Sequence, residues 1–163
     1  HLEKAVKLKN DDQSSLFYLA VTRKKLGKFK DAADSVKKAL ELDPENASYL
    51  NFLGYLYADM NVNLDQAESL LNKALAKDPS NGAYLDSLGW TFYRQGKYEL
   101  AIRKLTQARR ALAAAGTKDP VVYTHLGDAY AGAGDRDRAV AAWKQSLELK
   151  DDPVIREKIG SMK

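Results

Sequence analysis

The sequence predicts an all-α fold of paired antiparallel helices, and three observations lead to this prediction. Leu-Gly pairs recur at residues 53–54, 88–89 and 126–127, which are spacings of 35 and 38 residues. Within each period the apolar residues follow helical three-to-four spacing, stop at a turn and then resume. Small residues recur at equivalent places, although glycine inside a helix costs about 1 kcal/mol relative to alanine. A period of about 34 residues therefore indicates stacked helical repeats in which neighbouring helices pack closely.

The small residues fall on both helices of each period. In the first helix they are Ala20, Gly54, Gly89 and Gly127, and in the second they are Ala32, Ala67, Ala101 and Ala139.

Composition excludes several protein classes. The chain has 163 residues, of which 45% are hydrophobic and 29% are charged, so collagen-like, low-complexity and disordered classes are excluded. No apolar stretch approaches the roughly 18 residues of a membrane helix, so we expect no membrane insertion by this segment. The absence of cysteine excludes disulfide scaffolds, zinc knuckles, thiol catalysis and iron–sulfur clusters. A net charge of +4 is too small by itself to indicate nucleic-acid binding.

The amino-terminal half is interpreted as the end of one repeat followed by two complete repeats. Residues 1–10 match a pattern found 34 residues later, which assigns them to the second helix of a preceding repeat. Residues 13–46 form the next repeat, with its turn at Gly27. Residues 47–81 follow, and here Asn61-Val62-Asn63 replaces the usual turn with one extra residue. Because the chain starts without a methionine, we expect it to be a segment of a longer protein.

The carboxy-terminal half is interpreted as two further repeats and a cap. In the repeat at residues 82–119 the second helix is extended and stops at Gly116, because glycine is favoured just after a helix end. The repeat at residues 120–152 then starts with an aspartate cap and a proline in the first turn. Residues 153–163 have one apolar and one polar face, as a terminal capping helix requires.

Each unit resembles a tetratricopeptide repeat (TPR), and this resemblance extends over essentially the whole chain. In the second repeat the signature residues are Leu50, Leu53, Gly54, Tyr57, Ala67, Leu71, Ala74 and Pro79. The fourth repeat departs from the pattern with Ser146 where alanine is usual. The resemblance implies a right-handed superhelical solenoid whose first helices line a concave groove.

A narrower resemblance links the segments 51–55, 85–90 and 93–96 to bacterial TPR proteins, many of which are associated with the cell envelope. The compartment stays open between the bacterial cell envelope and the cytoplasm.

The groove that the resemblance implies contains many aromatic side chains. Trp, Tyr and Arg dominate binding hot spots, so an aromatic groove favours an apolar or amphipathic peptide or partner domain. We therefore expect a protein-interaction scaffold, with the identity of the protein or peptide partner open. An alternative is a self-association module, in which another copy of the chain fills the groove of a homo-oligomer. The expected groove residues are Phe17, Tyr18, Lys24, Asn51, Phe52, Tyr55, Asp86, Trp90, Tyr93, Arg94, His125 and Asp128.

A cluster of basic residues provides the second alternative, which is binding of an anionic partner or nucleic acid. The cluster lies at residues 23–30 and would attract anions through a salt-sensitive interaction. A solvated helix end is the favoured interpretation, because acidic residues follow closely and dilute the charge, so we do not expect nucleic acid as a partner. The cluster consists of Arg23, Lys24, Lys25, Lys28 and Lys30.

One group of residues could in principle carry chemistry. His125 and Asp128 are three residues apart on one helix, and Asp86 lies on the preceding repeat, so a histidine and two carboxylates could converge. An open groove with one histidine lacks the ligand number of a structural metal site and the enclosure of an active site. We therefore assign no catalytic, cofactor-binding or metal-binding residues, and expect no cofactor and no enzyme activity.

Overall fold

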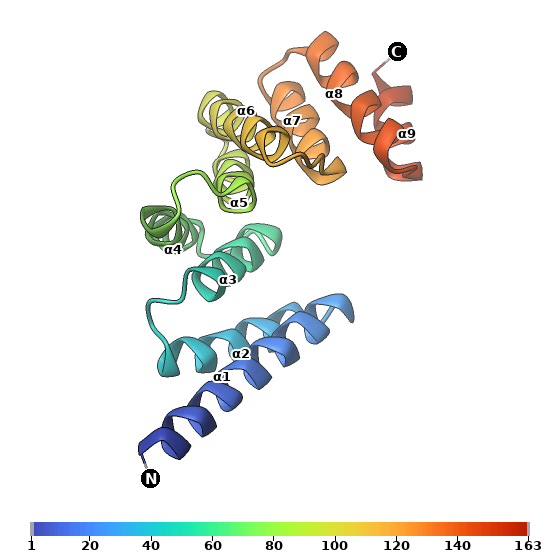
Figure 1. Cartoon of the computed structure of the whole chain (residues 1–163). Coiled ribbons are helices and arrows are strands. Elements are labelled where there is room, and N and C mark those ends of the chain that lie inside the picture. Colours follow the sequence, from blue (N-terminus) through green and yellow to red (C-terminus); the bar gives the residue numbers. More distant parts are fainter. Residues whose placement is uncertain (1, 163) are drawn as a thin grey trace. The chain divides into compact units, whose positions relative to one another are not determined.

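The computed structural model describes the backbone of residues 2–162 and the side chains of residues 12–162. All regular secondary structure in this part of the chain is α-helical (Figure 1). The helices are α1 (Leu2–Lys25), α2 (Phe29–Leu42), α3 (Ala47–Asp59), α4 (Leu64–Lys77), α5 (Gly82–Arg94), α6 (Tyr98–Ala114), α7 (Pro120–Gly132), α8 (Arg136–Leu149) and α9 (Pro153–Ser161).

The chain divides into two compact units, His1–Lys77 and Asp78–Lys163. In the first unit α1 packs against α2 and α3 packs against α4, while α2 also contacts α3. In the second unit α5 pairs with α6 and α7 pairs with α8, α7 contacts both helices of the preceding pair, and α9 packs on α8. Figure 1 shows this most plainly for α1 and α2, which lie side by side and run in opposite directions. The paired antiparallel helices predicted from the sequence are therefore present in both units.

The turns inside the helix pairs depend on residues that accept a left-handed backbone. Gly27, Gly96 and Gly134 have φ values of 73°, 75° and 79°. In the second pair Asn61 and Asn63 have φ values of 55° and 49°, so asparagine replaces glycine in this turn. Asparagine tolerates this conformation better than other residues that carry a Cβ atom, which explains how the longer turn is closed.

Helix starts are set by short polar side chains. Asn46, Asn81 and Asp119 cap α3, α5 and α7, each accepting a hydrogen bond from a backbone N–H in the first turn. Asp152 caps α9 in the same way. Such a cap satisfies donors that have no partner within the helix and is worth about 1 kcal/mol.

Close contact between the helices of a pair explains the recurrent glycines. A Cβ atom added at Gly54 would lie 2.7 Å from Leu71 Cγ, and one added at Gly89 would lie 2.6 Å from Leu105 Cγ. The alanines at the equivalent places of the second helices, Ala32, Ala67, Ala101 and Ala139, are fully buried. Packing at these contacts therefore outweighs the low helix propensity of glycine.

The amino-terminal segment differs from the expectation in one respect. Helix α1 has 24 residues and continues from Leu2 to Lys25. Its described backbone has no turn that separates residues 1–10 from the repeat at residues 13–46. Side chains 1–11 lie outside the described residues, and the assignment of residues 1–10 to a preceding repeat stays a prediction, as do the other repeat boundaries.

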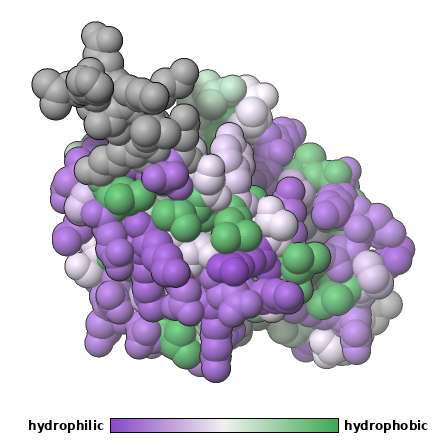
Figure 2. Space-filling view, turned by 90° about the horizontal axis from the view of Figure 1, so that it is seen from below, coloured by the Kyte–Doolittle hydropathy of each residue, from purple (hydrophilic) through white to green (hydrophobic). Residues whose placement is uncertain are grey.

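The surface shows no extensive apolar face in the view from below. In Figure 2 hydrophobic residues form small groups between more numerous hydrophilic ones. Among the described residues, no helix combines the length and the apolar character needed to cross a membrane.

Candidate functional site

The expected groove residues lie on α1 and α3 in the first unit and on α5 and α7 in the second. These are the first helices of their pairs, as the sequence predicts.

In the first unit, aromatic rings pack around the side chain of Phe17. Its ring centroid lies 4.7 Å from that of Tyr49 and 5.2 Å from that of Phe52, the latter in an edge-on arrangement. Aromatic pairs at these separations are stabilising beyond the area they bury. Phe17 therefore connects α1 to α3, whereas Tyr18 is 71% exposed.

Lys24 lies over the aromatic surface of α3. Its Nζ atom is 4.2 Å from the centroid of the Tyr55 ring and 5.9 Å from that of Phe52. Burial lowers the pKa of Lys24 below its usual range, and the negative charge of Asp59 partly opposes this shift. An ammonium group over two ring faces makes favourable cation–π contacts, which hold Lys24 on this surface.

Asn51 adds a polar feature to the same helix. Its side-chain Oδ1 atom is buried and has no hydrogen-bond partner among the described residues. A buried acceptor without a partner costs about 1–3 kcal/mol.

In the second unit, Trp90 is at the centre of a stack of flat side chains. The centroid of its ring lies 4.8 Å from that of the Tyr93 ring on the same helix and 4.2 Å from that of the His125 ring on α7. The interplanar angles are 17° and 14°. The Arg94 guanidinium lies 5.6 Å from the centroid of the Trp90 ring. Trp90, Tyr93 and Arg94 are each partly exposed. The stack holds these rings in a fixed orientation while leaving part of their surface accessible.

Tyr93 shows the electrostatic character of this surface. Burial raises the pKa of its hydroxyl, and the nearby Asp128 carboxylate and Tyr98 raise it further. Arg94 opposes this shift in pKa. The hydroxyl is therefore neutral at physiological pH and able to donate a hydrogen bond.

The three residues that could carry chemistry do not form one site. Asp86 and His125 are buried, and the Asp86 Oδ1 atom lies 2.9 Å from His125 Nδ1. Asp128 is also buried but takes part in a separate contact. It accepts a hydrogen bond of 3.0 Å from Trp143 Nε1 and hydrogen bonds of 2.6 and 2.8 Å from Lys158 Nζ.

These contacts correct the expectation that Asp86, His125 and Asp128 are open groove residues. Each is bound to side chains of its own chain, because a polar group removed from water needs a hydrogen-bond partner. Within residues 12–162, no three metal-ligating side chains are grouped in a way that could hold a metal ion.

Three models of the tetratricopeptide repeat match residues 18–82, 84–118 and 121–153. The chain belongs to the tetratricopeptide repeat family. Its fold is that of an all-α TPR solenoid, and TPR arrays are interaction scaffolds that bind protein partners. A comparison with curated proteins finds no match.

Solved structures of bacterial TPR proteins have the same fold. TTC0263, a thermophilic TPR protein of Thermus thermophilus, is 24% identical, with a TM-score of 0.80 and 92% of this chain and 80% of that chain covered. PilF of Pseudomonas aeruginosa is 22% identical, with a TM-score of 0.76 and coverage of 94% and 68%. An O-GlcNAc transferase mutant of Thermobaculum terrenum is 21% identical, with a TM-score of 0.76 and coverage of 89% and only 27%. At these identities the likeness shows the fold alone.

The side chains of the basic cluster at residues 23–30 do not form one patch, because Arg23 and Lys24 contact different helices. Arg23 donates hydrogen bonds from Nη1 to Ser35 Oγ and to the backbone oxygen of Asp31 on α2. Lys24 instead lies on the aromatic surface of α3. The remaining members, Lys25, Lys28 and Lys30, are exposed.

The sequence did not reveal the hydrogen-bond partners of the buried residues Asp128 and Ser146. Trp143 lies opposite Gly127, where an added Cβ atom would clash with the indole ring, and the missing side chain makes room for it. The recurrent small residue at position 127 indicated a close helix contact. It did not indicate that Trp143 donates a hydrogen bond to Asp128. Lys158 carried no signal, because the amphipathic pattern of residues 153–163 places it on the polar face. Ser146, the departure from the TPR pattern, is buried and donates a hydrogen bond of 2.9 Å to the backbone oxygen of Pro120.

Proposed function

We propose that this TPR array binds an apolar or amphipathic peptide segment of a partner protein on the inner faces of its first helices. The observation that carries the proposal is the stack of Trp90 and Tyr93, which is ordered by His125 and partly exposed. Rigid aromatic side chains bury much area at small entropic cost, and they are the residue types that most often dominate binding energies. A surface that is already ordered before binding loses little conformational freedom on association.

Arg94 gives this surface a polar component. Its guanidinium lies beside the Trp90 ring, and its Nε atom is buried without a hydrogen-bond partner among the described residues. Arginine is well suited to peptide carbonyl and carboxylate oxygens because its donors are held in a rigid planar arrangement. We therefore expect the peptide to place an apolar side chain on the stack and an oxygen acceptor near Arg94.

We further propose that the chain has no catalytic activity of its own. The histidine and the carboxylates on α5 and α7 serve as internal partners of each other or of Trp143 and Lys158. Their contacts account for their burial, so they act as structural groups.

The test compares peptide binding with folding stability. Peptides that bind the intact chain are selected from a random library, and their dissociation constants are measured with Trp90→Ala and Tyr93→Ala variants. We expect each substitution to weaken binding at least about tenfold, which corresponds to about 1.4 kcal/mol. Leu149→Ala removes an exposed apolar side chain from α8 and should leave binding unchanged.

Two outcomes would contradict the proposal. In one, both aromatic variants keep their affinity for the peptide but lose several kcal/mol of unfolding free energy, which would make the stack part of the core. In the other, light scattering shows that the chain associates with itself and the Trp90→Ala variant is monomeric, which would assign this surface to a second copy.

A further inference from the structure

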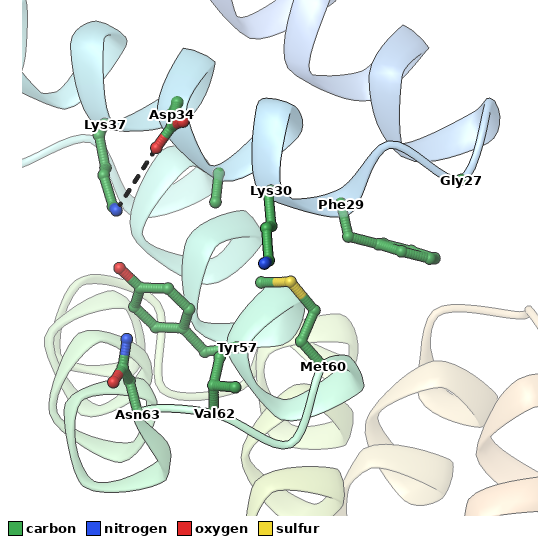
Figure 3. A pocket seen from close by; sticks show the side chains of 10 residues that line it. Gly27, Phe29, Lys30, Asp34, Lys37, Tyr57, Met60, Val62 and Asn63 are labelled. Carbon is green, nitrogen blue, oxygen red and sulfur yellow. Dashed lines mark ion pairs between the residues drawn. The ribbon is translucent and has the colours of Figure 1, made fainter.

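A second surface lies in the first unit on α2 and α3, and it contains no residue of the proposed peptide site. A pocket of about 580 Å³ opens between the amino-terminal half of α2 and the end of α3. This volume lies within the range of about 300–1,000 Å³ typical of ligand pockets. Figure 3 shows Tyr57 and Met60 on one side of the pocket and side chains of α2 on the other. The lining residues are Gly27, Phe29, Lys30, Ala33, Asp34, Lys37, Tyr57, Met60, Val62 and Asn63.

The second unit has a close contact at the place equivalent to this pocket. Tyr98 is the second-unit equivalent of Phe29, since each lies two residues after the glycine of its turn. Tyr98 packs so closely on Gly132 that a Cβ atom there would lie 2.4 Å from its ring. The residue equivalent to Gly132 is Asp59, which carries a side chain at this place. The Phe29 ring points away from Tyr57 in Figure 3.

The pocket is lined in part by exposed apolar side chains. Phe29 and Val62 are 37% and 42% exposed, and Leu26, which is 67% exposed, precedes the lining residue Gly27 in the chain. Exposed apolar side chains gathered at a pocket often mark an interaction site. The floor adds Met60, whose flexible side chain adapts to differently shaped apolar groups.

The charge around the pocket is positive. Lys30 and Lys37 line it from α2, and Lys28 lies in the adjoining turn. Asp34 neutralises only part of this charge through a long, exposed contact of 3.7 Å with Lys37. Helix α2 also starts here, and its N-cap residue Lys28 makes no side-chain capping hydrogen bond. The positive end of the helix dipole adds to the lysine charges, and Asp31 in the first turn of α2 offsets part of this charge.

We propose that this pocket binds an acidic peptide segment that inserts one large apolar side chain between α2 and α3. The apolar side chain contacts Tyr57, Met60 and Val62. Flanking carboxylates lie near Lys30 and Lys37, whose charges steer the approach of the peptide and set its orientation. Charge complementarity selects an acidic partner, and the apolar side chains of Tyr57, Met60 and Val62 favour a peptide side chain over the phosphate backbone of a nucleic acid.

The test uses two matched six-residue peptides, both acetylated and amidated. One has a Trp-Leu pair flanked on each side by two glutamates, and the other has lysines in place of the glutamates. Each is titrated into the intact ¹⁵N-labelled chain, and amide shifts are followed by NMR. We expect the acidic peptide to cause saturable shifts at Gly27, Val62 and Asn63, and to bind at least tenfold more tightly than the basic peptide.

Charge variants separate this pocket from general electrostatic attraction. Lys30→Glu combined with Lys37→Glu should weaken binding of the acidic peptide at least tenfold. Lys73→Glu combined with Lys144→Glu changes the net charge equally at exposed positions on α4 and α8, and should retain most of the affinity. Circular dichroism verifies that both variants keep their helices, as expected for substitutions of exposed residues.

Three results would overturn the proposal. The acidic peptide could fail to shift the pocket amides in a saturable way, or the two charge variants could bind it equally. A twelve-residue oligouridylate could displace the acidic peptide and shift the same amides more strongly, which would assign the pocket to nucleic acid. Trp90→Ala should leave all of these shifts unchanged, so failure of this pocket is distinguishable from failure of the groove proposal.

Discussion

At the scale of single residues, the second unit depends on buried polar groups that satisfy each other. Asp128 is 7% exposed and accepts hydrogen bonds from both Trp143 and Lys158, which come from different helices. A buried carboxylate is tolerated only when its charge is paired and hydrogen-bonded. Asp128 therefore holds α7, α8 and α9 in one arrangement.

We predict that Asp128→Ala lowers the free energy of unfolding by at least about 2 kcal/mol, because it leaves the buried Trp143 N–H without an acceptor. Urea denaturation followed by circular dichroism measures this loss. Glu148→Ala, an exposed position on α8, is the control and should change stability by less than about 0.5 kcal/mol. Equal stability of the two variants would show that Asp128 has no such role.

At the scale of helices, the distance between paired helices is set by residues without side-chain bulk. The α5–α6 contact at Gly89 leaves no room for a Cβ atom, and Leu105 fills the facing position. Interiors packed to this density respond to added volume by shifting side chains and backbone.

We predict that Gly89→Leu destabilises the chain by about 1–3 kcal/mol or more through overpacking against Leu105. Thermal unfolding measures the effect. Gly160→Leu is the matched control, because a Cβ atom at Gly160 on α9 meets no atom within 4 Å. A melting temperature unchanged by Gly89→Leu would mean that the inferred repeat register is wrong.

Helix α9 ends the second unit by covering the apolar side of α8. Ile155 is 3% exposed and packs in a cluster with Ala139 and Trp143, and Ile159 lies at the edge of the same cluster. These contacts shield the Trp143 side chain from water.

We predict that deletion of residues 153–163 lowers stability and promotes aggregation, because it exposes the Trp143 cluster and removes the Lys158 partner of Asp128. Urea denaturation and light scattering measure the two effects. A shortened chain that is monomeric and as stable as the parent would contradict the role of α9 as a cap.

At the scale of the whole molecule, stability in a helical repeat protein is close to a sum of terms within repeats and between neighbouring repeats. The close contacts at the glycines follow this pattern, since Gly54 meets Leu71 in the first unit and Gly127 meets Trp143 in the second. Substitutions at these two places share no contacting residue.

We predict that the destabilising effects of Gly54→Ala and Gly127→Ala add in the double variant to within about 0.5 kcal/mol. Urea denaturation of the parent, both single variants and the double variant provides the four free energies of this cycle. A larger coupling energy would show that the two units do not respond independently to packing defects.

Much of the fold follows from patterns that are local in sequence. The three-to-four apolar spacing, the glycines and asparagines of the turns and the caps at Asn46, Asn81 and Asp119 each depend on residues within a few positions. They could therefore be inferred without knowing the tertiary structure. The stacking of Trp90 on Tyr93 belongs to this group, because residues three apart share a helix face.

By itself, the sequence determined the repeat period, the pairing of helices and the helices that carry the aromatic residues. Only the tertiary structure decided which polar residues are buried and with whom. Asp86 meets His125 across 39 positions, and Asp128 meets Lys158 across 30. It also decided that a pocket opens between α2 and α3, because the space between two helices depends on how all the side chains of both pack. Such contacts join helices that are distant in sequence, and their partners are set by packing geometry, which a local pattern does not contain.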